Sequence, residues 1–214
     1  MPPEQRPIPR FIAEPPHDAL PYGRWADQLR GLFLEACREI EGEDDIGDPG
    51  DIKWFPERTF NGRTYIPATA PTSEGFEVFG YVAFEHGPGG EPSSFLARAD
   101  YTDETADANP DWKLDLSDEE IDVWRGQREL SANVALVWGH ALLPGGALAT
   151  AELGPTTVDQ CELADDRFTL VALDNYTGDF LDVKLWGKGG GELAAESLYE
   201  DDDEADEDED SADE

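Results

Sequence analysis

The chain has 214 residues, and its fifty Asp and Glu outnumber its fifteen Lys and Arg, which gives a formal net charge of −35. A surface this negative repels nucleic-acid phosphates and anionic membranes, and it attracts cations and basic proteins. We therefore expect neither nucleic acid nor a membrane as a partner.

The acidity has two parts. Residues 200–214 hold twelve acidic residues and no basic one, so the remainder still carries −23. Many acids with few lysines are typical of a salt-loving organism, in which concentrated cations screen the repulsion. A composition rich in Ala, Gly, Pro and Arg fits a GC-rich bacterium equally well, and both explanations stay open.

The composition indicates a folded protein. Hydrophobic residues make up 39 % of the chain, which includes six Trp, and this is enough to build a core over about 180 residues. Cys37 and Cys161 are far apart in sequence and are expected to be buried free thiols. The N-terminus has no apolar leader, and the apolar stretch 134–143 is shorter than the roughly 18 residues of a membrane span, so we expect a cytoplasmic protein.

The N-terminal part predicts an arm and a helix. Seven prolines within residues 1–21 favour an extended arm over residues 1–20. Residues 22–41 then form an amphipathic helix in which one apolar stripe repeats at helical spacing, and Gly42 is a plausible stop signal. The stripe contains Trp25, Leu29, Leu32, Phe33, Ala36 and Ile40.

The next part of the chain predicts a hairpin, two paired strands and a second helix. Residues 58–65 read as a hairpin, because Asn61-Gly62 suits the positive-φ positions of a type I′ turn. Residues 76–85 and 95–101 alternate as partner strands. Ser117 followed by Glu120 has the form of a capping box, which predicts a short helix that ends near Gly126.

The C-terminal half predicts regularly spaced strands separated by turn residues. Such spacing favours a sandwich-like or barrel-like structure. The expected strands are residues 132–142, 147–153, 157–162, 168–173, 179–186 and 193–199. The fold class is thus α+β, mainly antiparallel β, with one long and one short helix and a disordered acidic tail over residues 200–214.

Residues 21–199 are expected to form one domain, although a division into residues 21–130 and 131–199 is possible.

No residue pattern predicts catalysis, a cofactor or a metal site. With fifty acidic residues, many carboxyl pairs are close by chance, so clusters such as Asp118-Glu119-Glu120 and Asp165-Asp166 are interpreted as solvated surface. Gly187-Lys188-Gly189 lacks the remainder of a phosphate-binding loop. These absences favour a non-catalytic protein but leave open whether it is an enzyme.

Trp138 and His140 are the candidate pocket residues. They share one face of a predicted apolar strand, where an aromatic ring and an ionisable group could meet a ligand. A histidine on such a strand is more often a hydrogen-bonded core residue.

The leading hypothesis is a non-catalytic interaction protein, of adaptor or inhibitor type, that binds a basic protein. The tail would supply low-specificity attraction through Asp201, Asp202, Asp203, Glu204, Asp206, Glu207 and Asp208. A DNA mimic is one form of this hypothesis. The alternative is a small-molecule-binding or enzymatic β domain whose acidity reflects only its host. The sequence predicts no oligomeric state.

Overall fold

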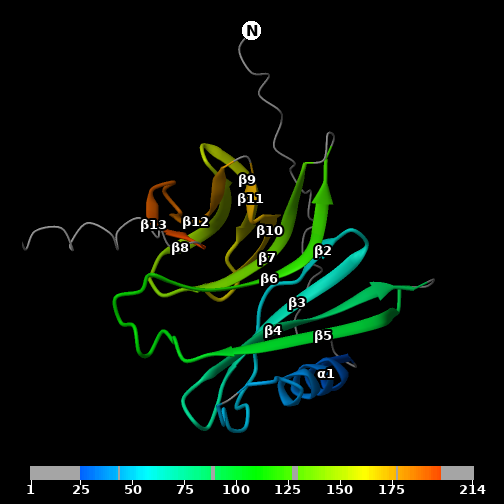
Figure 1. Cartoon of the computed structure of the whole chain (residues 1–214). Coiled ribbons are helices and arrows are strands. Elements are labelled where there is room, and N and C mark those ends of the chain that lie inside the picture. The colour runs from blue at the N-terminus through cyan, green and yellow to red at the C-terminus, as the bar shows by residue number, and fades with distance from the viewer. Residues whose placement is uncertain (1–24, 43, 88–89, 127–129, 177, 199–214) are drawn as a thin grey trace, which may run out of the picture.

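The protein is mainly antiparallel β, with three sheets, one of them a half-barrel, and one N-terminal helix (Figure 1). The computed structural model describes residues 25–42, 44–87, 90–126, 130–176 and 178–198. The predicted arm at residues 1–20 and the predicted acidic tail at residues 200–214 lie outside these ranges. The prediction of a mainly antiparallel fold with an N-terminal helix is confirmed.

The helix α1 covers the first sheet. It spans Ala26–Arg38, and Leu29, Phe33 and Cys37 are buried at intervals of one helical turn. It lies along β4 and β5, as the predicted apolar stripe requires (Figure 1). The helix ends before Gly42, because Glu39 already forms its C-cap and donates its N–H to the Ala36 carbonyl.

The first sheet has the order β1-β3-β4-β5, and β2 also pairs with β3. Its strands are β1 Lys53–Trp54, β2 Arg58–Phe60, β3 Arg63–Pro71, β4 Glu77–His86 and β5 Pro92–Thr102. The predicted hairpin is confirmed, since Asn61 and Gly62 have φ values of 51° and 80°. Thr59 lies opposite Thr64, and their hydroxyl oxygens are 2.8 Å apart.

The second sheet has the order β10-β7-β6, and it corrects one prediction. Its strands are β6 Leu114–Arg125, β7 Ser131–Ala141 and β10 Arg167–Leu173. The predicted helix at Ser117–Glu120 is wrong, because these residues belong to β6 and pair with Trp138–Ala135 of β7. The local sequence favours a helix cap, but pairing with the central apolar strand β7 outweighs this preference and makes these residues a strand.

The third sheet has the order β11-β12-β8-β9, and β13 also pairs with β12. Its strands are β8 Gly146–Leu153, β9 Thr156–Glu162, β11 Asn175–Tyr176, β12 Asp179–Gly187 and β13 Glu192–Ser197. All of the C-terminal strands expected from the sequence are present, with ends that differ by one or two residues.

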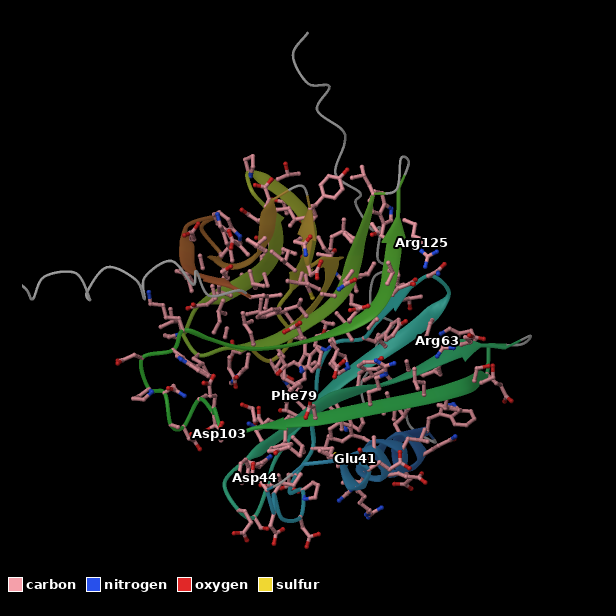
Figure 2. The ribbon with its side chains drawn as sticks, viewed as in Figure 1. Glu41, Asp44, Arg63, Phe79, Asp103 and Arg125 are labelled. Carbon is pink, nitrogen blue, oxygen red and sulfur yellow. The ribbon has the colours of Figure 1, made fainter. Side chains whose placement is uncertain are left out.

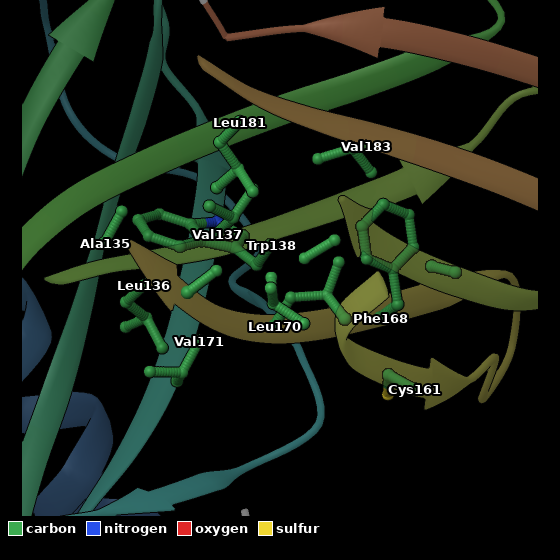
Figure 3. Packing of buried hydrophobic residues seen from close by; sticks show 14 of the residues in the cluster. Ala135, Leu136, Val137, Trp138, Cys161, Phe168, Leu170, Val171, Leu181 and Val183 are labelled. Atoms are coloured by element: carbon green, nitrogen blue, oxygen red, sulfur yellow. The ribbon is translucent and has the colours of Figure 1, made fainter. Parts of the chain in front are cut away.

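The central strand β7 organises the main core. It is apolar on both faces, and Leu136, Val137 and Trp138 are completely buried. Residues of β10 and β12 surround it, including Phe168, Leu170 and Leu181 (Figure 3). A second cluster lies between α1 and the opposite face of β3 and β4. Each sheet therefore buries at least one apolar face.

Arg58 of β2 joins the three sheets. Its Nε donates to the Thr169 carbonyl of β10 at 2.8 Å, and its Nη2 donates to both Asp159 carboxylate oxygens of β9 at 2.9 Å. Nη2 also reaches the Gln160 carbonyl at 2.6 Å. Arg58 is 5 % exposed, so this ion pair is shielded from water.

We predict that Arg58→Ala destabilises the fold by about 3–5 kcal/mol, because the buried Asp159 loses its counter-charge. Chemical denaturation gives the free energy of unfolding. The control is Arg63→Ala, whose bond to Glu85 at 2.7 Å lies at the surface and is expected to contribute no more than about 1 kcal/mol. Equal losses in the two variants would contradict a special role for Arg58.

Candidate functional site

The structure describes the two candidate pocket residues but not the candidate partner-binding residues of the tail. Trp138 and His140 lie two residues apart on β7, as predicted. The seven tail residues named above as partner-binding lie outside the described residues. Cys37 in α1 and Cys161 in β9 are buried and free.

Trp138 belongs to the core. It is completely buried, and its ring packs against Phe79 of β4 with ring centroids 6.4 Å apart. Its Nε1 has no hydrogen-bond partner among the described residues, and neither has the hydroxyl of Thr169, its neighbour on β10. The pocket at Trp138 and His140 stays a prediction.

His140 lies between charged groups. Asp115 of β6 and Arg167 of β10 are its partners across the two ladders. Burial lowers the pKa of His140, and Lys53 and Arg167 lower it further, while Asp115 and Asp166 oppose them. The neutral imidazole is therefore favoured.

The acidic seam is a dense group of carboxyls that the sequence analysis did not single out. Between residues 100 and 122 there are ten acidic residues and one basic residue, Lys113. The acidic seam consists of Asp100, Asp103, Glu104, Asp107, Asp111, Asp115, Asp118, Glu119, Glu120 and Asp122. These residues lie at the end of β5, in the connection and along β6. β5 is an outer strand of the first sheet, and β6 is an outer strand of the second sheet.

A hollow of about 180 Å³ lies on the seam, between β4, β6 and the connection that precedes β6. Phe79 points from β4 into the space between the first two sheets, and Asp103 begins the connection (Figure 2). Trp112 is the second aromatic ring of the hollow, and Thr102 and Ser117 supply hydroxyls. Its four carboxyls come from Glu77, Glu104, Asp115 and Asp118.

Glu77 has the most perturbed acidity in the hollow. Burial, together with the negative charges of Asp115 and Asp107, raises its pKa from 4.5 to about 7, while Lys53 opposes them. At neutral pH the two protonation states of Glu77 are therefore comparably populated.

Burial also raises the pKa values of Asp115, Asp118 and Glu119. The negative charge of Asp174 raises the pKa of Asp118 further, whereas the positive charge of Arg98 opposes the rise of the pKa of Glu119. Asp118 and Glu120 are exposed, in keeping with their interpretation as solvated surface, whereas Glu119 between them is partly buried. All three lie on the edge strand β6, where neighbouring protein atoms replace part of the water around a carboxyl.

The four carboxyls of the hollow form no ion pair within 4.0 Å among the described residues. Several basic groups are instead engaged elsewhere. Arg58 and Arg63 pair with Asp159 and Glu85, and Lys184 lies 3.0 Å from Glu152. Arg167 donates to the Trp54 carbonyl at 2.7 Å. The seam therefore keeps an excess of negative charge.

Two larger and more open depressions lie elsewhere. One of about 790 Å³ is lined by Trp186, Leu163 and Lys188, and one of about 650 Å³ by Arg98, Ile121 and Arg125.

Within the described ranges, no group of three or more His, Cys, Asp or Glu is placed to hold a metal ion. In the same ranges, no helix has the length and apolar character needed to cross a membrane.

Comparisons with protein-family models, curated proteins and solved structures found no match to this chain.

We predict that Glu77 makes stability depend on pH. Its folded-state pKa is raised, so its contribution to folding is complete below about pH 4.5 and is lost as the pH rises to about 7. The difference in unfolding free energy between Glu77→Gln and the native chain should change across this window and be constant above it. Urea denaturation at a series of pH values measures the difference.

Glu85→Gln is the control of opposite sign. A hydrogen bond from Arg63 lowers the pKa of Glu85, so its contribution to stability is present above pH 4.5 and is lost as the pH falls below that value. If the difference in unfolding free energy between Glu77→Gln and the native chain also changed only below pH 4.5, Glu77 would be an ordinary surface carboxyl.

Proposed function

We propose that this protein binds a basic protein partner through the acidic seam and performs no reaction on it. The observation that carries the proposal is the ratio of ten acidic residues to one basic residue over residues 100–122, on two outer strands and the connection between them. A partner with several Lys or Arg would be steered toward this surface.

The raised pKa values support the proposal energetically. Burial makes the ionised forms of Glu77, Asp115 and Asp118 less favourable than those of free carboxyls in water, and repulsion by Asp115 adds to this effect at Glu77. A cation placed among these groups would favour their ionised forms, so part of the binding free energy would come from relief of this repulsion. The acids of residues 201–208 would add attraction of low specificity.

The occupied basic groups support the exclusion of nucleic acid. Phosphate binding needs several free Lys or Arg on one face, with aromatic rings between them. Arg58, Arg63 and Lys184 are already paired with carboxylates of the same chain. Arg98 and Arg125 share their depression with Glu120 and Asp122, so its local charge is balanced.

One observation favours the alternative of a ligand-binding or enzymatic β domain. His140 lies opposite Asp115, and a carboxylate beside an imidazole is a common acid–base arrangement. Trp138, the other residue of that hypothesis, is completely buried, so the acidic seam is the better supported surface.

We predict that the seam binds a basic peptide in a salt-dependent way. Fluorescence anisotropy with dye-labelled decalysine should show binding at about 0.05 M KCl that is lost at about 0.5 M KCl. The triple variant Asp103→Asn, Asp111→Asn, Glu120→Gln should weaken binding about fivefold or more, because it removes charge from the seam.

The matched control removes the same charge from the helix α1 and its C-cap. Asp27→Asn, Glu35→Gln, Glu39→Gln changes exposed carboxyls on the element that covers the opposite face of the first sheet, and binding should weaken less than about twofold. Equal weakening in the two variants would mean that decalysine responds to net charge alone, as expected if the acidity is host adaptation. Absence of binding at low salt would refute the proposal directly.

A further inference from the structure

The hollow on the seam combines several kinds of group around one space. Carboxyls reach it from β4 and β6 and from the connection before β6, and the rings of Phe79 and Trp112 form apolar walls. Phe79 is held in place by its contact with Trp138. The hollow is therefore a shaped cavity with acceptors and π-faces, which distinguishes it from the exposed carboxyls around it.

The inner wall of the hollow is held from behind. Trp138 lies opposite Ser117 in the β6–β7 ladder and packs on Phe79, and both of these residues line the hollow. Trp138 itself is completely buried behind them, so it fixes the wall and does not face the cavity.

From these contacts, and resting on the proposed binding of a basic partner, we infer that the hollow receives one cationic side chain of that partner, a Lys ammonium or an Arg guanidinium. The charged end lies between Glu77 of β4 and Asp115 of β6, whose charges already act on each other.

The size of the hollow fits one side chain. Its volume of about 180 Å³ is much smaller than the 790 Å³ and 650 Å³ of the two open depressions. The hollow holds the aliphatic stem and charged head of one long side chain, but no folded element. The stem contacts the apolar walls while the head remains polar, as long basic side chains do at protein surfaces.

The rings select a cation over a neutral group of similar size. A positive charge close to the face of Trp112 or Phe79 is attracted by the ring quadrupole. The carboxylates act in the same direction, and each can accept charge-assisted hydrogen bonds from ammonium or guanidinium.

The entry of the cation should be coupled to proton release. Glu77 is partly protonated at neutral pH, and Asp115, Asp107 and Lys53 are the charged groups that act on it. A second positive charge near Glu77 favours its ionised form, so binding releases a proton and strengthens as the pH rises through 7.

The test compares two charge-matched double variants of the full chain. Glu77→Gln/Asp115→Asn removes carboxyls of the hollow, and Asp111→Asn/Glu120→Gln removes exposed carboxyls of the seam outside it. Titration calorimetry with decalysine at pH 7, in buffers of different ionisation enthalpy, gives the affinity and the number of protons released.

We expect the hollow variant to weaken binding about tenfold or more and to abolish proton release. The exposed variant should weaken it about twofold to threefold with release unchanged. Trp112→Ala, which changes no charge, should weaken binding about fivefold. In the native chain, the indole N–H resonance of Trp112 should shift on titration, and unfolding curves verify that every variant is folded.

The outcomes separate the two proposals. Equal weakening by the two double variants overturns the assignment of an anchor to the hollow and leaves binding at the seam intact. Failure of decalysine to bind the native chain overturns both. Binding of free acetyl-lysine amide as tight as that of decalysine overturns a peptide side chain as the occupant.

Discussion

The buried bond between Arg58 and Asp159 is the interaction on which the arrangement of the sheets depends. Arg58 leaves the hairpin of the first sheet, is almost completely buried, and donates to residues of the second and third sheets. Asp159 in turn accepts from the Val171 N–H of β10 at 2.9 Å. The geometry of this ion pair fixes how the first sheet packs on the second. The acidic seam depends on that packing.

This placement explains why carboxyls become perturbed at the seam. β4 presents Phe79 toward β6, and the two outer strands β5 and β6 bring their acids to the same side of the molecule. Charged side chains on outer strands also discourage pairing with other chains. The acids can therefore prevent aggregation along the strands while they create the potential that attracts a basic partner.

The sequence predicted the strands of the C-terminal half and the hairpin, because turn residues and period-two alternation are local signals. It mispredicted β6 for a physical reason. Ser117 and Glu120 match a helix cap, and acidic residues have low strand propensity, but pairing with β7 decides the conformation. The hollow was missed because its residues come from β4, the connection and β6, which only the packing of the first two sheets brings together.

His140 and Trp138 show what the sequence could say about a site. Their shared face was predictable from alternation, whereas the burial of Trp138 behind Phe79 depends on a strand from the other sheet. The density of acids over residues 100–122 was visible in the sequence. The sequence alone did not connect these acids with Glu77, which lies more than twenty residues upstream and lines the same hollow.

The central claim is that packing of the first two sheets buries seam carboxyls without a counter-cation. Carbon-detected NMR titration of the Glu77 side-chain carboxyl tests it most directly. The account predicts a midpoint near 7 that falls when a basic peptide is added. A midpoint at the ordinary value of 4.5, indifferent to the peptide, would contradict it.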